Sequence, residues 1–385
     1  MFRIGQEEID AVARVINSGK LFKVNDGTKE VFSFEDEMKE KFGTEYALFM
    51  TSGKAALISA LVGMGIGPGD EVIVPGYTYI ATAIAVVAAG AIPVIAEIDD
   101  SLTLDPIDVE KKITPNTKAI IPVHIQGLPC KMDELTALGK KYNIQILEDA
   151  CQADGGSYKG KRLGTIGEAG ALSFNYFKVI TAGEGGALFT DDKKIFERAY
   201  IHHDSSAIAF FGNQLENNDE DQFCGTEFRT SEISAAILRE QLKRMDGILT
   251  DLRKVKKTVM DALKDDFEFA PSNDIDGDCG LIIPFKFSSE TEARAFAEKT
   301  GGGLPIDTGK HVYSNWTAIM NKRGAFHPLM DPFKMESNKD IIPDYKPDMC
   351  PKTLEILSKN VYINLNPDWT NAEITDIIKK CKNAK

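Results

Sequence analysis

The sequence has few cysteines, and they lie far apart. None of the six stands in a C-x-x-C pair, so we expect unpaired thiols in a reducing cytoplasm, with neither a disulfide framework nor a zinc site. Basic residues are also in deficit, since 45 Lys+Arg stand against 58 Asp+Glu for a formal net charge of −13. Such a surface repels a phosphate backbone, which argues against nucleic acid as the main partner.

No unbroken apolar run is long enough to cross a membrane. The longest apolar stretch, residues 80–98, is interrupted by Thr82, Gly90, Pro93 and Glu97, and it indicates a helix, a turn and a strand. The first residues show no basic region followed by an apolar run, so no signal peptide is expected. Neither G-x-x-x-x-G-K-[ST] nor a G-x-G-x-x-G after a first strand is present, which argues against a Walker loop and a nicotinamide dehydrogenase.

What the chain does contain is enough apolar sequence for a large core. It has 385 residues, 43% of them hydrophobic, which suits one large and one small domain. Seven short apolar runs indicate strands, at residues 46–50, 71–74, 92–95, 119–122, 144–147, 170–174 and 186–189. Helical segments lie between several of them, at residues 55–64, 82–89, 106–112 and 132–142. This alternation predicts an α/β fold with a mostly parallel, seven-stranded sheet covered on both faces.

The second part of the chain has a different pattern. Residues 231–263 indicate one long helix or a bent pair, followed by a strand near 281–287 and an acidic helix at 290–299. We therefore expect a large domain over 1–245, whose N-terminal segment is a candidate to pack on the other domain, and a smaller α+β domain over 246–385. Residues 321–350 lack periodicity and are expected to form a long surface or active-site loop.

Three clusters with chemical potential follow expected strands, where α/β sheets bind ligands. The first is the small-residue turn of residues 51–57, whose free N–H groups and helix dipole can bind an anion, although such turns are common. The second is the acid pair Glu148-Asp149. These carboxylates either cap the next helix or, when buried, need a positive partner such as a protonated pyridine nitrogen.

The third cluster places Lys178 among apolar neighbours, shortly after a strand that ends in Ser173. Burial disfavours an ammonium and favours the neutral amine that attacks a carbonyl to form a Schiff base; a lone lysine is otherwise a surface residue with a buried stem. Together, an anion-binding turn, a carboxylate for a ring nitrogen and a Schiff-base lysine are the parts of a pyridoxal 5′-phosphate (PLP) site.

At these residues the chain resembles the DegT/DnrJ/EryC1/StrS family of sugar aminotransferases, which are fold type I PLP-dependent enzymes. The resemblance runs from about Gly5 to the final helix. Its motifs are Ser52-Gly53-x-Ala55-Ala56-Leu57, Gly69-Asp70-Glu71-Val72-Ile73-Val74-Pro75, Glu148-Asp149-Ala150-x-Gln152, Ser173-Phe174-x-x-x-Lys178 with Gly183-Glu184-Gly185-Gly186, and Gly225-x-x-x-Arg229-x-Ser231-Glu232-Ile233.

The resemblance implies a role for each matching residue. Lys178 forms the Schiff base and acts as general acid/base, and Asp149 pairs with the pyridinium nitrogen. Gln152 lies on the O3′ side of the ring, and Tyr79 stacks on its face, unless Tyr79 is an ordinary core aromatic. The phosphate is held by Ser173, by the backbone at Gly53 and Lys54, and by Arg229 from the neighbouring subunit. The last contact makes the protein a homodimer with shared active sites.

The chain departs from the family at two of these positions. Lys54 stands where the family usually has Thr, so its ammonium either contacts the phosphate or points to solvent. Glu227 stands where the family commonly has Asn, two residues before Arg229. A carboxylate beside a phosphate is unfavourable, so Glu227 is expected to turn away or to bind polar groups of the amino donor or substrate.

Two histidines are further candidates for the substrate side. His124 follows an expected strand at the carboxyl edge of the sheet, although a hydrogen-bonded core histidine fits it equally well. His327 lies where related enzymes place a loop over the substrate. His202-His203-Asp204 is a weak metal pattern, and we expect no metal.

The function that follows is transfer of an amino group from glutamate or glutamine to a keto-sugar or sugar-like ketone, in a ping-pong mechanism that serves amino-sugar synthesis. Two alternatives remain open at this point: a PLP-dependent sugar dehydratase or deoxygenase, and a non-catalytic PLP-binding regulatory protein. In the dehydratase branch a histidine replaces the lysine, so Lys178 argues against it.

Overall fold

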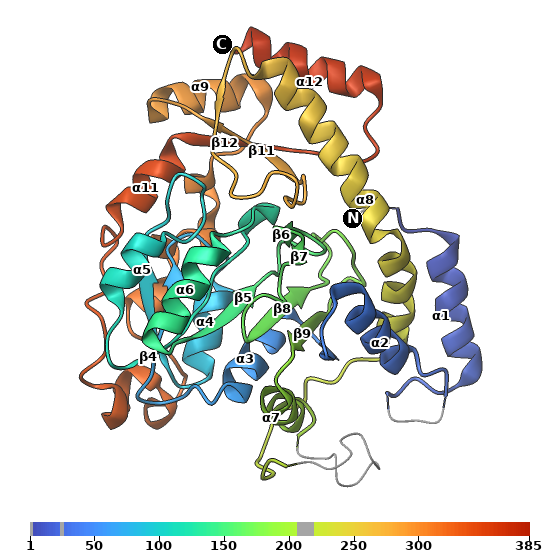
Figure 1. Ribbon diagram of the computed structural model, residues 1–385, viewed down its shortest axis with the longest axis vertical. Coiled ribbons are helices and arrows are strands. Elements are labelled where there is room, and N and C mark those ends of the chain that lie inside the picture. Colours follow the sequence, from blue (N-terminus) through green and yellow to red (C-terminus); the bar gives the residue numbers. More distant parts are fainter. Residues whose placement is uncertain (1–2, 24–26, 206–218) are drawn as a thin grey trace.

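The computed structural model describes residues 3–23, 27–205 and 219–385, and its main element is a seven-stranded sheet (Figure 1). The order across the sheet is β1-β9-β8-β5-β4-β2-β3. The strands are β1 (Tyr46–Met50), β2 (Glu71–Pro75), β3 (Ile92–Ala96), β4 (Thr117–Ile120), β5 (Gln145–Asp149), β8 (Ala169–Ser173) and β9 (Gly186–Thr190). Only β9 runs antiparallel to its neighbours. The prediction of seven mostly parallel strands is confirmed.

Helices cover both faces of this sheet. Successive residues of one strand enter different cores: Val72 and Val74 of β2 pack with α3, α4 and α7, whereas Ile73 packs on the other face with α2, α5, α6 and α8. The strands are therefore apolar without alternation, because each face is buried. These helices are α2 (Glu30–Phe42), α3 (Gly53–Gly63), α4 (Ala81–Ala88), α5 (Pro106–Lys112), α6 (Met132–Tyr142), α7 (Lys193–His203) and α8 (Glu232–Leu263).

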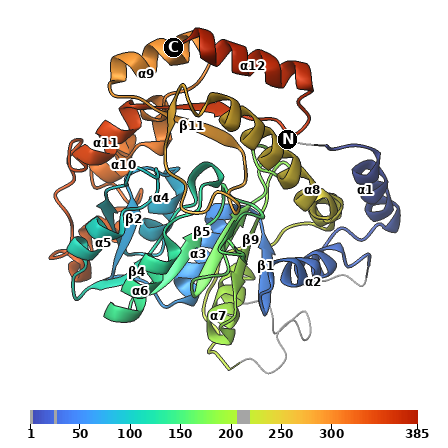
Figure 2. The ribbon, with the colours of Figure 1, turned by 45° about the horizontal axis from the view of Figure 1, so that its top comes forward.

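A second, three-stranded antiparallel sheet forms the centre of the C-terminal part. It contains β10 (Glu268–Phe269), β11 (Ile282–Lys286) and β12 (Asn360–Asn364). Figure 2 shows α9 (Glu290–Thr300) and α12 (Asn371–Asn383) on the outer side of this sheet. Helix α8 joins the two parts as one unbroken helix that passes through residue 245. The domain limits 1–245 and 246–385 stay a prediction.

The remaining elements are short. They are α10 (Thr317–Met320), α11 (Pro351–Ser358), the hairpin of β6 (Ser157–Tyr158) and β7 (Lys161–Arg162), and single 3-10 turns at Ile125–Gly127, Pro305–Asp307, Gly309–His311, Tyr313–Asn315, Pro328–Met330, Pro332–Lys334 and Glu336–Asn338. Among the residues described, no helix combines the length and apolar character needed to span a membrane.

The segment expected as a long loop, residues 321–350, packs along the edge of the large sheet. The hydroxyl of Tyr345 donates to the carbonyl of Pro93 on β3 at 2.6 Å, and Asn338 Nδ2 donates to the carbonyl of Gly90 at 3.0 Å. Tyr345 and Asn338 are both buried. The segment thus shields the edge strand β3, which would otherwise expose unpaired backbone groups.

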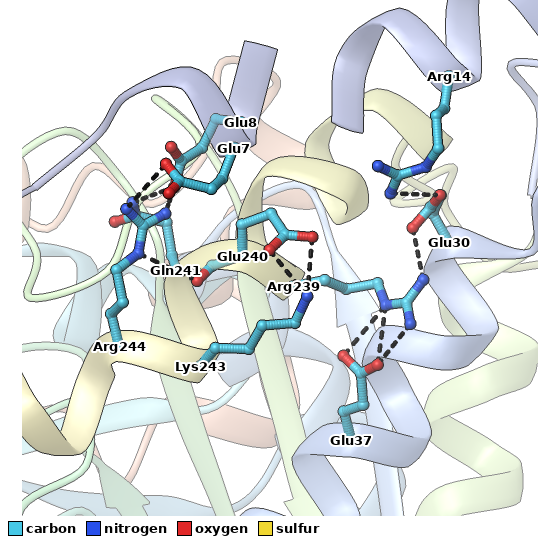
Figure 3. A network of polar contacts seen from close by, with 10 residues as sticks. All are labelled: Glu7, Glu8, Arg14, Glu30, Glu37, Arg239, Glu240, Gln241, Lys243 and Arg244. Atoms are coloured by element: carbon cyan, nitrogen blue, oxygen red, sulfur yellow. Dashed lines mark hydrogen bonds and ion pairs between the residues drawn. The ribbon is translucent and has the colours of Figure 1, made fainter. Parts of the chain in front are cut away.

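The N-terminal helices α1 (Gln6–Ser18) and α2 are held against α8 by a polar network (Figure 3). Arg239 on α8 binds Glu30 at 2.7 Å and Glu37 at 2.5 Å, both on α2. Further along α8, Gln241 Nε2 donates to Glu8 of α1 at 2.7 Å, and Arg244 pairs with the same carboxylate. Glu8 and Glu30 are nearly fully buried, so each carboxylate depends on these partners.

We predict that Arg239→Met lowers the free energy of unfolding by about 2 kcal/mol, because, among the described residues, it leaves the buried Glu30 carboxylate with only the 3.5 Å contact to Arg14. The matched control is Arg294→Met. Arg294 also pairs with two carboxylates, Glu290 and Asp307, but the three side chains are about half exposed, so its loss should change little. Urea unfolding of both variants measures the difference, and equal effects would show that burial of the network does not matter.

Candidate active site

A cavity of about 530 Å³ lies between the carboxyl edge of the large sheet and the ends of β11 and β12. Strands β1, β5 and β8 all point their carboxyl ends to this edge, so residues that follow them in sequence meet in space. The cavity is lined by Tyr79, Gln126, Gln152, Asp154, Asn175, Phe177, Lys178, Val179, Leu281, His311 and Asn364.

Asp149 ends β5 and is 4% exposed. Its Oδ2 accepts a 2.7 Å hydrogen bond from the hydroxyl of Thr82, and its Oδ1 accepts from the backbone N–H of Cys151 at 3.1 Å. The Thr82 hydroxyl lies 2.8 Å from that of Thr78 and within 3.2 Å of the carbonyl of Tyr79. This network holds the Asp149 carboxylate in one orientation beneath the segment that carries the exposed ring of Tyr79.

Residues 52–54 form a cradle at the start of α3. Ser52 caps the helix by accepting from the N–H of Ala55 at 3.1 Å, so the preceding N–H groups of Gly53 and Lys54 have no partner within the helix. A Cβ at Gly53 would stand 2.9 Å from the Cβ of Ser173 and 2.6 Å from Cys151 Sγ, which shows how closely the turn packs on the end of β8. Two N–H groups and a serine hydroxyl thus lie together at a helix N-terminus, the arrangement that binds phosphate.

Gly186 allows this approach from the other side. It begins β9, and a Cβ there would lie 2.2 Å from the backbone carbon of Ser52. Any side chain at this position would push the helix start away from the sheet. The Lys54 side chain is exposed, and its role toward a phosphate stays a prediction.

Lys178 supplies the amine in this cavity. It follows β8 on a loop that returns to β9, and its side chain is partly buried in the cavity wall. Within the described ranges, no hydrogen bond or ion pair engages its Nζ. Burial raises the pKa of Asp154 and of Cys151 well above the ordinary value and lowers the pKa of His311, and the positive charge of Lys178 acts in the downward direction on all three. An amine that no carboxylate holds in an ion pair is available to react with a carbonyl group.

Tyr79, Gln152 and His311 surround the same space. The ring of Tyr79 is 44% exposed and lies 5.4 Å from that of His311. Gln152 Oε1 accepts from the backbone N–H of Gln126 at 3.1 Å, which fixes the orientation of its amide. Burial lowers the pKa of His311 and the charge of Lys178 lowers it further, against a backbone contact with Thr308 that raises it, so His311 is neutral at pH 7.

Glu148, the neighbour of Asp149, has an internal role. Its carboxylate accepts from the N–H groups of Gly164, Ile166 and Gly167 at 2.5–2.9 Å and lies 3.0 Å from His124 Nε2. His124 is fully buried, and its Nδ1 accepts from the N–H of Cys130 at 3.1 Å. Both ring nitrogens of His124 are therefore occupied within the protein, and its assignment to the substrate side stays untested.

Three other predicted residues do not line the cavity. His327 is exposed, and its ring caps a 3-10 turn through the N–H of Leu329. Arg229 forms ion pairs with Asp204 and, at 2.7 Å, with Glu227 of its own chain. The Glu227 side chain is thus turned toward Arg229 and is half exposed. The roles predicted for these three residues remain predictions.

Sequence reasoning missed Thr82, Asp154 and His311. Thr82 follows Tyr79 by three positions and Asp154 follows Gln152 by two. Their closeness in sequence to these motif residues could have drawn attention to them. No sequence pattern indicated that His311 lies at the site, because in the sequence it is far from every strand of the large sheet. The bond from the N–H of Thr78 to the carbonyl of His311, at 2.9 Å, brings it to the cavity.

A larger hollow of about 820 Å³ lies at the opposite edge of the sheet, at the amino ends of β4, β5 and β8. It is lined mainly by lysines and other polar groups of the surface, among them Lys118 and Lys140. The parallel strands β4, β5 and β8 begin at this hollow, whereas ligands of α/β sheets bind at the edge where the parallel strands end. Nor do the residues described contain a group of three or more His, Cys, Asp or Glu side chains placed to hold a metal ion.

The cavity fits PLP. The cradle at Gly53, Lys54 and Ser173 suits a phosphate, the carboxylate of Asp149 suits a ring nitrogen, and the unpaired amine of Lys178 suits an aldehyde. Together with the seven-stranded sheet, these features define a fold type I PLP-dependent enzyme. Comparison with known proteins then gives the family: residues 3–292 match the model of the DegT/DnrJ/EryC1/StrS aminotransferase family. The chain belongs to this family and is a PLP-dependent aminotransferase.

Individual relatives agree with this assignment. The chain is 30% identical to the spore coat polysaccharide biosynthesis protein SpsC of Bacillus subtilis, over 98% of this chain and 94% of that protein. It is 42% identical to dTDP-3-amino-3,4,6-trideoxy-alpha-D-glucose transaminase of Streptomyces venezuelae, over 62% of this chain and 60% of that protein. Among solved structures, 3-amino-5-hydroxybenzoic acid synthase matches 100% of this chain and 97% of its own, with 27% identity and a TM-score of 0.82.

The comparisons also bear on the two alternatives. A GDP-4-keto-6-deoxy-D-mannose-3-dehydratase of E. coli matches with a TM-score of 0.81, but at 21% identity it shows a shared fold alone. Two relatives with higher identity, at 42% and 35%, are named as a transaminase and an aminotransferase. The prediction of an aminotransferase is confirmed over a dehydratase and over a non-catalytic regulatory protein.

Proposed function

We propose that the protein transfers an amino group from glutamate or glutamine to the carbonyl of a keto-sugar or a similar cyclic ketone. The observation that carries the proposal is the amine of Lys178 in a cavity that also holds polar side chains suited to hydroxyl groups, among them Gln126, Asn175 and Asn364. Relatives named for sugar and cyclitol transamination support the acceptor class. One of them, L-glutamine:2-deoxy-scyllo-inosose aminotransferase of Streptomyces kanamyceticus, supports glutamine as a donor.

Each proposed role follows from the environment of the residue. PLP, when bound, supplies an aldehyde and an electron-accepting ring. Asp149, held by Thr82 and Cys151, keeps the ring nitrogen protonated through its charge. Tyr79 would stack on the ring of PLP and Gln152 would contact it, since both side chains line the cavity. The N–H groups of Gly53 and Lys54 and the hydroxyl of Ser173 bind the phosphate. Lys178, the amine in the cavity wall, would bind the aldehyde and carry a proton at its Nζ.

A two-step assay tests this function. The holoenzyme is first mixed with glutamate, glutamine or alanine without acceptor, and loss of its visible absorbance shows which donor it accepts. The protein is then freed of donor and offered keto-sugars, some linked to a nucleotide and some free, with recovery of the absorbance as the readout. We expect glutamate or glutamine to bleach the band and at least one keto-sugar to restore it. Recovery only with open-chain keto acids would refute the sugar acceptor.

We further propose that the protein is a homodimer in which each active site uses Arg229 of the partner subunit. We also propose that it works in the cytoplasm. The six free cysteines support a reducing compartment. The contacts of Arg229 with Asp204 and Glu227 define the competing hypothesis, in which Arg229 only braces its own chain. These two hypotheses differ in whether Arg229 acts across an interface.

Mixing two inactive variants distinguishes them. Lys178→Ala and Arg229→Ala subunits combined in one dimer place both lesions in one site and leave the other site intact. Random exchange gives about half heterodimers, each with one working site, so activity should recover to roughly a quarter of that of the parent enzyme. Demonstrated exchange of subunits without recovery of activity would show that Arg229 acts within its own chain.

A further inference from the structure

His311 lines the cavity that contains Lys178, and none of the roles above uses it. The other four histidines of the chain all lie in its described part, and none of them lines this space. The ring of His311 is partly buried and lies 5.4 Å from that of Tyr79. A histidine in this cavity that takes no part in holding PLP is a candidate to contact the substrate.

The backbone fixes the place of His311 against the segment that carries Tyr79. The N–H of Thr78 donates to the carbonyl of His311 at 2.9 Å. The N–H of Ile80 donates to the carbonyl of Lys310 at 3.0 Å. Two segments that are far apart in the sequence thus hold each other on both sides of the Tyr79 position, and the ring of His311 is built into the cavity wall.

One hydrogen bond fixes the tautomer of the His311 ring. Its Nδ1 lies 3.3 Å from the carbonyl oxygen of Thr308. A carbonyl oxygen only accepts hydrogen bonds, so Nδ1 carries the hydrogen and donates it. Burial lowers the pKa of His311, so the ring is neutral at pH 7 and Nε2 bears no hydrogen. Nε2 is therefore a hydrogen-bond acceptor.

This acceptor has no partner and is open to the cavity. No hydrogen bond within the described part of the chain engages Nε2 of His311. In that same part, both ring nitrogens of His203 are buried without a partner, whereas neither ring nitrogen of His311 is. An unpaired Nε2 that is not buried can be reached by a molecule in the cavity.

The two substrates of the proposed reaction differ in what they offer to such an acceptor. The carboxylates of glutamate only accept hydrogen bonds, whereas each hydroxyl group of a keto-sugar can donate one. The side-chain amides of Gln126 and Asn364 line the same cavity and make no hydrogen bond within the described residues. Amides both donate and accept, as a substrate with several hydroxyl groups requires.

We propose that His311 is a specificity-determining residue for the acceptor: its Nε2 accepts a hydrogen bond from a hydroxyl group of the keto-sugar. The inference rests on the function proposed above and assigns one residue to recognition of the acceptor. The contact forms with the keto-sugar and not with glutamate, so His311 distinguishes the two substrates that share the cavity. A ketone that lacks this hydroxyl group leaves Nε2 unpaired and should bind less tightly.

The test measures binding of an unreactive analogue to the full-length holoenzyme. The probe is the alcohol made by reducing the ketone of a keto-sugar that the parent enzyme accepts, and calorimetry gives its dissociation constant. In His311→Asn the amide N–H can replace Nδ1–H toward Thr308, whereas the acceptor at Nε2 is lost. We expect the dissociation constant to rise about fivefold, the effect of one hydrogen bond between neutral groups. His311→Gln places an oxygen near the position of Nε2 and should restore most of the binding.

Analogues of the probe that each lack one hydroxyl group identify the group that His311 contacts. With the parent holoenzyme, one of these analogues should bind about fivefold more weakly than the full alcohol. With His311→Asn the same analogue should bind as tightly as the full alcohol, because the partner of the missing hydroxyl is already absent.

His202→Asn is the matched control. His202 is also partly buried, and its Nδ1 lies 3.1 Å from the hydroxyl of Ser59, but it does not line the cavity. This variant should bind the alcohol as the parent does. Loss of the visible absorbance with glutamate is a second control, since glutamate, unlike glutamine, has no side-chain N–H. His311→Asn should keep the parent rate in this step.

An unchanged dissociation constant in His311→Asn, or in His311→Ala if the first variant folds poorly, would overturn the inference. A glutamate step that slows as much as binding of the alcohol weakens would also overturn it, because the ring would then support the cofactor and not the acceptor. Failure of the parent enzyme to accept any keto-sugar refutes the proposed function itself, and this result is seen before any variant is made.

Discussion

Replacing Lys178 with alanine is expected to lower kcat/KM for amino transfer by about 10⁴-fold or more while the protein still folds. Among the residues that line the cavity, Lys178 is the one amine, so no neighbour can take over either the covalent bond to the cofactor or the proton transfer. The side chain makes no hydrogen bond or ion pair within the described residues, so its loss breaks no such contact there. Steady-state kinetics of the variant measure the loss of activity, and circular dichroism shows whether the variant folds.

The control for this experiment is Lys118→Ala. Lys118 lies in the larger hollow at the opposite edge of the sheet, where its Nζ donates to the carbonyl of Pro115. We expect its activity to equal that of the parent protein. Activity that falls in Lys118→Ala and survives in Lys178→Ala would move the active site to the other edge and contradict the assignment made here.

Asp149→Asn is expected to bind PLP and to lose activity by about 10²–10³-fold, the effect of removing one preorganised electrostatic group. Asparagine keeps an oxygen for the N–H of Cys151, and the Thr82 hydroxyl can turn toward Thr78 or the carbonyl of Tyr79, so the local structure should persist. What disappears is the negative charge that keeps the ring nitrogen protonated. Kinetics, together with the cofactor content of the purified variant, measure this.

Thr82→Val separates the charge of Asp149 from its orientation. This variant retains the carboxylate and removes only the 2.7 Å hydrogen bond to Oδ2. We expect a loss of activity smaller than that of Asp149→Asn, because one neutral hydrogen bond contributes about 1 kcal/mol. If Asp149→Asn kept near-normal turnover, the carboxylate of Asp149 would have no electronic role. The group that pairs with the ring nitrogen would then have to be a different residue.

Much of the fold follows from local sequence patterns. All seven strands of the large sheet were predicted within three residues of their observed ends, and the helices Met132–Tyr142 and Pro106–Lys112 were predicted to the residue. These elements are short and strongly apolar, and they are bounded by capping and turn residues such as Asp105, whose side chain accepts from the N–H of Ile107. Such signals act within a few residues of the chain, so they can be read without a partner.

The structure of residues 321–350 could not be predicted from local sequence patterns. Their sequence has no period, because the segment forms single turns that follow the contour of the sheet edge. Tyr345 and Asn338 are buried by contacts with Pro93 and Gly90, which lie about 250 positions earlier in the chain. A polar residue such as asparagine gives no local sign that it will be buried, since its environment is made by distant residues.

The sequence by itself determined the fold class, the family and the principal chemistry of the site. Lys178 and Asp149 could be singled out because Asp149 ends one recognisable strand and Lys178 lies on the loop after another, and the carboxyl ends of parallel strands must meet at one edge. Only the tertiary structure decided which other groups join them. It placed His311 against Tyr79, paired Arg229 with Glu227, occupied both nitrogens of His124 within the core, and left Asp154 buried beside Lys178 without a hydrogen bond. The physical reason is that burial and charge partners are properties of assembled surfaces, whereas strand and helix propensities are properties of short segments.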